Sequence, residues 1–338
     1  MKGVRPGPTL GRMGSNDMGA PLDAVPRFFD LRAGGNDAAA ELCASLGAHV
    51  PFIAPKFFYD PLGSRLFEAI CELPEYGLTR AERGIFDRFG EEIAARVGID
   101  RPFVDLGAGN CEKAERLFDV LDPSQYVAVD IAADFLQDRL ATLALRRPGL
   151  PIVGVAEDFT ASLQLPEAVE PGPRTVFYPG SSIGNFAPEA ALAFLGRMRE
   201  ACCAGGHLIL GADLVRDKHS LDIAYDDALG VTAAFNLNVL RNVNNVLEGD
   251  FDVADWRHVA FFDPVTSRVE MHVEARYDVA VRWRGGGRRF SATDRIHTEN
   301  SYKYTLPGLR ALLQRAGFTE WQVWTDDSRS FAVAVAAS

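Results

Sequence analysis

The chain has 338 residues, 47% of them apolar, which is enough to bury a core in one large domain or two modest ones. Its formal net charge is −11 with no block of Lys or Arg, which argues against nucleic acid and anionic membranes as partners. No apolar run reaches the roughly 20 residues of a membrane-spanning helix. The five cysteines and six histidines are scattered without metal-ligand spacing, so we expect no metal site and a reduced, cytoplasmic protein.

The first part of the chain carries few signals of regular structure. Residues 1–36 begin with a stretch rich in Gly, Pro and Met, and we expect this segment to be disordered or extended. Residues from about 37 to 92 are predicted to form helices and turns, with a break at 59–64.

A nucleoside-binding pattern follows. A predicted strand at 102–106 enters a turn containing Gly107 and Gly109, and a second strand at 125–130 ends in Asp130, 21 positions after Gly109. Glycines let the backbone approach a ligand, and an acid at the end of the second strand accepts ribose hydroxyls. The alternative is a tight strand-to-helix turn with a solvated loop acid.

The residues after this turn narrow the choice of cofactor. A dinucleotide fingerprint has glycine at position 112, where pyrophosphate meets the helix N-terminus, but this chain has Glu112 followed by Lys113. An acidic side chain repels a diphosphate. The pattern therefore favours a nucleoside cofactor without phosphates, of which S-adenosylmethionine (SAM) is the obvious one.

Three more predicted strands continue the sheet, at 151–155, 175–178 and 207–212, with a helix at 188–203 before the last. Asp158 and Phe159 follow the first of these strands, where an acid can bind the adenine amino group and an aromatic ring can cover the base. The alternative, which the sequence supports equally well, is that Asp158 is an ordinary loop acid and Phe159 is a core residue.

The loop after the strand at 175–178 contains two glycines and Asn185. Ligands bind beyond the carboxyl ends of strands in open α/β sheets, so this loop is expected beside the reactive end of the cofactor. The Asn185 amide offers donors and an acceptor, which suits a substrate amine. A turn residue at a helix entry is the alternative, since Asn is common there.

The pattern changes after residue 216. Residues 219–247 are predicted to be helical, and residues 268–283 alternate in the manner of antiparallel strands, with a return strand at 289–292. A helix at 308–316 and strands at 319–325 and 331–336 then complete the sheet as an antiparallel hairpin. We expect a SAM-binding domain (81–215 and 304–338) interrupted by a substrate-binding or lid domain (37–80 and 216–303).

Several long motifs occur in order along the chain: Tyr59-Asp60 with Gly63-Ser64, Leu73-Pro74-Glu75-Tyr76, Thr79-Arg80 with Glu82, Gly180-Ser181-Ser182-Ile183-Gly184-Asn185, Tyr225-Asp226-Asp227, Gly230 to Asn236, Glu270-Met271, and Thr298-Glu299 with Ser301. From about residue 40 to the C-terminus, the chain resembles the histidine-specific, SAM-dependent Nα-methyltransferases, which make hercynine in the first step of ergothioneine biosynthesis. The resemblance implies a Rossmann-like class I methyltransferase sheet, parallel with a C-terminal antiparallel hairpin, plus an inserted α+β substrate domain.

The resemblance also implies roles for individual residues. The positions that match cofactor contacts are Tyr59, Gly107, Gly109, Lys113, Asp130, Asp158 and Phe159. The positions that match substrate contacts are Tyr76, Asn185, Tyr225, Met271, Glu299 and Ser301. In the family the two tyrosines bind the substrate carboxylate, Asn holds the α-amine, Glu and Ser read the imidazole, and Met lines the pocket. Tyrosine hydroxyls hold a carboxylate without a positive charge that would repel the sulfonium.

Asn185 and Tyr59 are the candidate catalytic residues. Either Tyr59 or a water relays the proton of the amine, or the amine binds directly in its neutral form. Gly77 and Leu78 follow Tyr76 where the family usually has a second aromatic residue and a proline. The alternative substrate is therefore another amino acid or a histidine derivative, and a SAM-binding module without catalysis is the alternative class. We expect a monomer.

Overall fold

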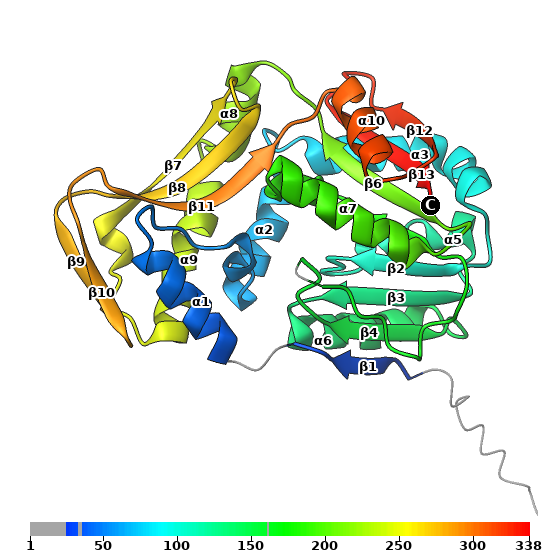
Figure 1. The fold of residues 1–338 in the computed structure, drawn as a ribbon, viewed down its shortest axis with the longest axis horizontal. Coiled ribbons are helices and arrows are strands. Elements are labelled where there is room, and N and C mark those ends of the chain that lie inside the picture. Colours follow the sequence, from blue (N-terminus) through cyan, green and yellow to red (C-terminus); the bar gives the residue numbers. More distant parts are fainter. Residues whose placement is uncertain (1–24, 33–35, 161) are drawn as a thin grey trace, which may run out of the picture.

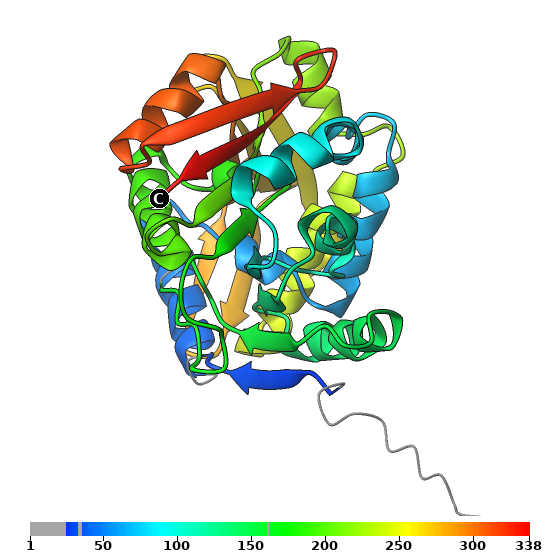
Figure 2. The same ribbon diagram turned by 90° about the vertical axis from the view of Figure 1, so that its right-hand side faces the viewer.

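The computed structural model describes residues 25–32, 36–160 and 162–338, and Figures 1 and 2 show their arrangement. Its centre is an eight-stranded sheet in the order β1-β4-β3-β2-β5-β6-β13-β12. The strands are, in that order, β1 (Arg27–Asp30), β4 (Ile152–Ala156), β3 (Gln125–Asp130), β2 (Pro102–Leu106), β5 (Thr175–Tyr178), β6 (His207–Asp213), β13 (Phe331–Ala337) and β12 (Glu320–Thr325). The first six are parallel, and β13 is antiparallel to both β6 and β12. The predicted fold class is confirmed.

Helices cover both faces of this sheet because its strands are apolar on both sides. Alternate residues of a strand point to opposite faces. Phe103 of β2 therefore packs in one cluster with residues of α3 (Leu78–Val97) and α6 (Ala133–Arg146). Its neighbour Val104 packs in the other cluster, with residues of α7 (Pro188–Cys202) and α10 (Leu306–Arg315). The short helices α4 (Glu112–Glu115) and α5 (Phe118–Leu121) follow β2.

The segment between β6 and α10 builds a separate three-stranded antiparallel sheet, in the order β11-β8-β7 (Figure 1). Its strands are β7 (Trp256–Asp263), β8 (Arg268–Ala275) and β11 (Arg295–Tyr302), and a hairpin of β9 (Val279–Trp283) and β10 (Gly286–Phe290) extends beyond them. The helices of this segment are α8 (Lys218–Tyr225), α9 (Val231–Leu247) and the 3-10 turn η4 (Val253–Asp255). The elements that pack on α9 from the N-terminal part are α1 (Asn36–Gly47), η2 (Pro55–Phe58) and α2 (Pro61–Glu72).

The structure contains three strands that the sequence did not predict, β1, β7 and β11. Arg27–Asp30 lie within the segment expected to be disordered or extended, and they form β1, which pairs in parallel with β4 at the sheet edge. The rest of that expectation, for residues 1–24 and 33–35, lies outside the described residues. None of the helices in the described part of the chain is long and apolar enough to cross a membrane.

Candidate active site

The ends of β2 and β3 place the predicted nucleoside-binding residues together. Gly107 and Gly109 both have positive φ, 71° and 52°, a conformation that favours glycine. The Gly109 N–H donates to Asp130 Oδ2 at 2.9 Å, and the Ala132 N–H donates to Asp130 Oδ1 at 2.9 Å. Each carboxylate oxygen keeps a free lone pair for a ligand hydroxyl. Burial raises the pKa of Asp130, while these backbone bonds oppose that rise.

The residues around this turn fit SAM. Asp105 Oδ1 at the end of β2 is buried and has no hydrogen-bond partner among the described residues, so an acceptor remains for a ligand donor. The Phe159 ring lies 3.7 Å from where a Cβ on Gly107 would be, which places an aromatic face beside the turn. Asp158 pairs instead with Lys56 Nζ at 2.8 Å. Burial would raise the pKa of Asp158, but the bonds from Lys56 and Thr160 hold it below its usual range.

Lys113 connects the cofactor turn to the loop after β5. Its Nζ lies 2.7 Å from Glu82 Oε2 and 3.0 Å from where a Cβ on Gly180 would be. Glu82 Oε1 accepts a hydrogen bond from the Gly180 N–H at 2.7 Å. The Glu82 side chain is almost wholly buried. Burial would lower the pKa of Lys113, but Glu82 raises it, so the lysine is a cation. Glu82 belongs to a motif seen in the sequence, but only the structure shows that it joins these two segments.

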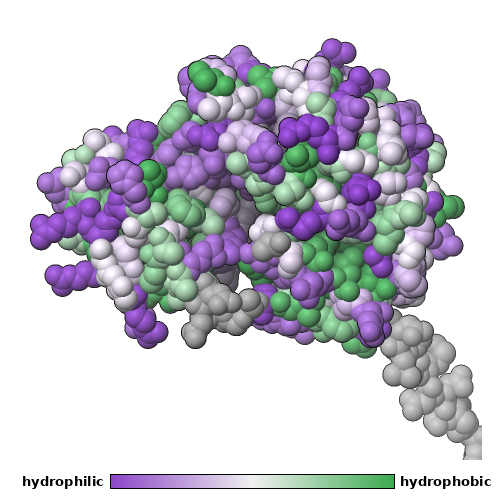
Figure 3. All heavy atoms as spheres, viewed as in Figure 1, coloured by the Kyte–Doolittle hydropathy of each residue, from purple (hydrophilic) through white to green (hydrophobic). Residues whose placement is uncertain are grey.

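A cavity lies against the loop that follows β5, and Figure 3 shows the surface hollowed between the two parts of the molecule. The cavity is lined by all of the predicted substrate and catalytic residues: Tyr59, Tyr76, Asn185, Tyr225, Met271, Glu299 and Ser301. The predicted cofactor residues other than Tyr59 do not line this cavity and lie at the strand ends beside it.

Tyr59 is placed by the start of α2. Asp60 caps this helix, because its Oδ1 accepts the Gly63 N–H at 2.7 Å. A Cβ on Gly63 would meet the Phe58 carbonyl oxygen at 1.7 Å, so only glycine fits there. Asn238 of α9 also donates to Asp60 Oδ1, at 2.7 Å. The motif Tyr59-Asp60 with Gly63 therefore forms the N-terminus of α2 and binds this helix to α9 of the inserted segment.

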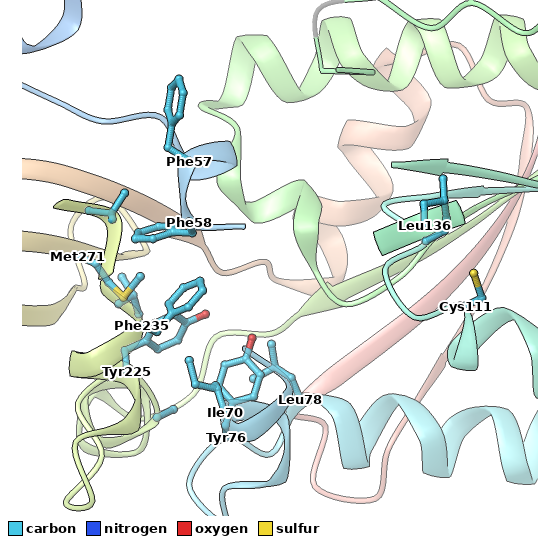
Figure 4. Close-up of a cluster of buried hydrophobic side chains, with 14 of the residues drawn as sticks. Phe57, Phe58, Ile70, Tyr76, Leu78, Cys111, Leu136, Tyr225, Phe235 and Met271 are labelled. Carbon is cyan, nitrogen blue, oxygen red and sulfur yellow. The ribbon is translucent and has the colours of Figure 1, made fainter. Parts of the chain in front are cut away.

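Tyr76 and Tyr225 face the cavity from different parts of the chain, with ring centroids 6.0 Å apart (Figure 4). Tyr76 precedes α3, whereas Tyr225 ends α8. Burial raises the pKa of Tyr76 and of Tyr59 well above the usual tyrosine value. These phenols keep their protons at neutral pH, so they act as hydrogen-bonding groups.

Strand β11 brings the last two predicted substrate residues to the cavity. Glu299 pairs across the strands with Met271, and Ser301 pairs with Val269. The register shifts between His297 and Glu299, which is the position of a β-bulge, a device that re-aims side chains. Glu299 and Ser301 both lie within β11 itself, in its C-terminal half. Burial raises the pKa of Glu299 to about 7, although Lys303 opposes the rise.

Close backbone packing holds Asn185 against this strand. Asn185 ends the 3-10 helix η3 (Ser182–Asn185), which contacts β11. A Cβ on Gly184 would lie 2.8 Å from the Tyr302 carbonyl oxygen, so glycine is required for this approach. The loop from the main sheet and the strand from the inserted segment thus meet at the cavity.

Asn236, in the last of the α9 motif positions, ties α9 to the small sheet. Its Nδ2 donates to the His272 carbonyl oxygen at 2.9 Å, and Thr298 Oγ1 donates to its Oδ1 at 2.7 Å. Both bonds are buried, and Thr298 is the residue before Glu299. Asn236 therefore fixes the strand that carries Glu299.

Sequence reasoning missed a buried ion pair behind the cavity. Lys303 Nζ lies 2.7 Å from Asp213 Oδ2, and both side chains are wholly buried. Lys303 stands two residues after Ser301, on the same side of an extended chain, and Asp213 ends β6. The spacing from Ser301 could have indicated that Lys303 lies near the site. Nothing in the sequence indicated that Lys303 would pair with Asp213, which lies 90 positions earlier.

Comparisons with known proteins show the family to which the chain belongs. A family model described as histidine-specific, SAM-dependent methyltransferase matches residues 38–338. The histidine N-alpha-methyltransferase of Mycolicibacterium smegmatis is 37% identical over 312 residues, covering 89% of this chain and 96% of that protein. The histidine N-alpha-methyltransferase of Mycobacterium tuberculosis is 37% identical over 293 residues, covering 84% and 90%. Ergothioneine biosynthesis protein 1 of Neurospora crassa is 30% identical over 278 residues, covering 79% of this chain and 31% of that protein.

Proposed function

The chain belongs to the family of histidine-specific, SAM-dependent methyltransferases, and we propose that its cavity is where methyl groups pass from SAM to the α-amine of L-histidine. Three transfers give hercynine. The observation that carries this proposal is the convergence of five side chains on one cavity against the loop after β5: Tyr76, Asn185, Tyr225, Glu299 and Ser301.

Each group has a role suited to one part of histidine. The hydroxyls of Tyr76 and Tyr225 donate to the carboxylate, and the Asn185 amide holds the amine. Glu299 accepts a hydrogen bond from an imidazole N–H, and Ser301 serves the other ring nitrogen. A substrate without the ring would leave these polar groups unpaired, which is how such a site rejects it.

SAM, when bound, supplies a methyl group already activated by its sulfonium. The chain's own work is alignment and exclusion of water, and alignment alone contributes up to about 7–11 kcal/mol in well-oriented reactions. Asn185 holds the neutral amine with its lone pair toward the methyl group. Tyr59 and Tyr76 keep their protons, so the proton of the amine leaves to water through hydrogen bonds rather than to a tyrosinate.

We also propose the division of labour expected from the sequence, with residues 37–80 and 216–303 closing on the substrate and residues 81–215 and 304–338 holding SAM. Packing of α1, η2 and α2 on α9, and of α3 on the main sheet, supports it. Hydrogen exchange tests it: histidine should protect α9 and β11, and SAM alone should protect the strand ends of the main sheet. Equal protection of both regions by SAM alone would contradict the division.

The variant Asn185→Ala tests the central role. It should abolish methylation of histidine while SAM still binds, as measured by calorimetry, because the amine loses its holder and the cofactor turn is untouched. Full turnover by this variant would overturn the role of Asn185. A panel of free amino acids, assayed by initial rates in parallel, tests the substrate, and strong activity only on substrates without imidazole would overturn the reading of Glu299.

A further inference from the structure

The Lys303 ammonium is surrounded by three oxygen atoms. It pairs with Asp213 Oδ2 at 2.7 Å and donates to Tyr225 Oη and to Ser301 Oγ, both at 2.8 Å. Its side chain is wholly buried, so it lies behind the two hydroxyl groups that line the cavity. Burial would lower the pKa of Lys303, but Asp213 and Tyr225 hold it above its usual range. The side chain is therefore a fixed cation.

This cluster carries a net positive charge. Arg216 Nη1 lies 2.5 Å from Asp213 Oδ1, so two cations, Lys303 and Arg216, share one carboxylate. The Lys303 ammonium also lies 4.6 Å from the centroid of the Tyr225 ring. A cation therefore stands directly behind Tyr225, one of the two hydroxyls expected to hold the substrate carboxylate.

An ammonium group only donates hydrogen bonds. Each hydroxyl oxygen therefore accepts a bond from Lys303 and keeps its own O–H for the other hydroxyl, 2.8 Å away, or for a group in the cavity. A neighbouring cation polarises these O–H groups, and in a buried site such hydrogen-bond chains strengthen one another.

We propose that Lys303 is a positioning residue that makes Tyr225 and Ser301 donors toward the substrate and supplies, one hydroxyl away, the positive charge that complements the substrate carboxylate. The identity of the substrate rests on the proposed function. Setting the cation back by one hydroxyl keeps it out of direct contact with the ligands, so the carboxylate gains attraction while the sulfonium and the methylated amine meet no ammonium at the cavity wall.

The test separates this role from structural support. In Lys303→Met, Asp213 keeps Arg216 as a partner, and the double variant Lys303→Met/Asp213→Asn removes both charges of the buried pair. We expect the double variant to melt near the wild-type temperature, because both charges of the wholly buried pair are removed together. Arg216 loses its carboxylate partner, but its side chain is 20% exposed, so water can solvate the guanidinium. Its Kd and KM for histidine should nevertheless rise about tenfold or more, with a smaller change in kcat.

Histidinol, which has an alcohol in place of the carboxylate, gives the deciding comparison. The ratio of the histidinol Kd to the histidine Kd, measured by calorimetry, should fall in the double variant, whereas loosened packing would weaken both ligands equally. Lys218→Met, which removes an ammonium at the far end of α8, is the control and should keep the wild-type ratio.

A wild-type ratio in the double variant would overturn the proposal. Should that variant fail to fold, Lys303→Gln, which keeps a neutral donor, must show the reduced ratio or the proposal is wrong. Failure of the wild-type protein itself to bind and methylate histidine would instead refute the proposed function on which the inference rests, so the two failures are distinguishable.

Discussion

Replacing Glu299 with glutamine should stabilise the protein in a pH-dependent manner. Burial raises the pKa of Glu299 from an ordinary 4.5 to about 7. Below pH 4.5 the carboxyl is protonated in both the folded and the unfolded states, so it contributes nothing. Between pH 4.5 and about 7 the folded protein retains a proton that the unfolded chain has released, so stability falls as the pH rises. Each pKa unit corresponds to about 1.4 kcal/mol, so a shift from 4.5 to about 7 makes the ionised carboxylate cost at most about 3.5 kcal/mol.

Glutamine is neutral throughout, so the free energy of unfolding of Glu299→Gln should exceed that of the wild type by a margin that grows from pH 5 to pH 8. Urea denaturation of the ligand-free proteins measures it. Glu189→Gln, at an exposed position of α7, is the control and should show no such growth. A margin for Glu299→Gln that is the same at pH 5 and pH 8 would refute the reasoning. The variant should also discriminate less well against amino acids without imidazole.

Two other predictions concern the cofactor turn and the approach of the two parts. Asp130→Asn should weaken SAM binding about tenfold or more in calorimetry, because an amide NH₂ cannot accept the Gly109 N–H or a ribose hydroxyl; unchanged affinity would exclude this contact. Gly184→Ala should lower both the melting temperature and kcat, because its Cβ would lie 2.8 Å from the Tyr302 oxygen. Gly196→Ala, inside α7 with nothing within 4 Å, should keep full activity and gain about 0.5–1 kcal/mol. Equal behaviour of the two glycine variants would show that the approach of η3 to β11 is not tight.

The main sheet was largely predictable because its signals are local. Apolar runs, the glycine turn and the acid at Asp130 lie within 30 residues of one another, and β2 and β3 have the predicted bounds. The family was predicted from motifs, and the match of its model to residues 38–338 confirms it. The SAM-dependent chemistry follows from that membership.

What the sequence left open depends on contacts between distant segments. β7 carries a continuous apolar run and β11 carries mostly polar side chains, so neither strand shows a clear alternation of apolar and polar residues. Glu82 joins Gly180 across 98 positions, and the Lys303–Asp213 pair spans 90, so only the fold brings these charges next to the cavity. Asp158 was predicted as an adenine contact and pairs with Lys56, and its role toward SAM stays a prediction, as does the monomeric state.

Mass spectrometry and NMR of the product formed from L-histidine, SAM and the purified protein test the central claim most directly. The account predicts a gain of three methyl groups, all on the α-nitrogen, with the imidazole ring unmodified. Methylation of a ring nitrogen, or recovery of unchanged histidine under conditions in which SAM is bound, would contradict it.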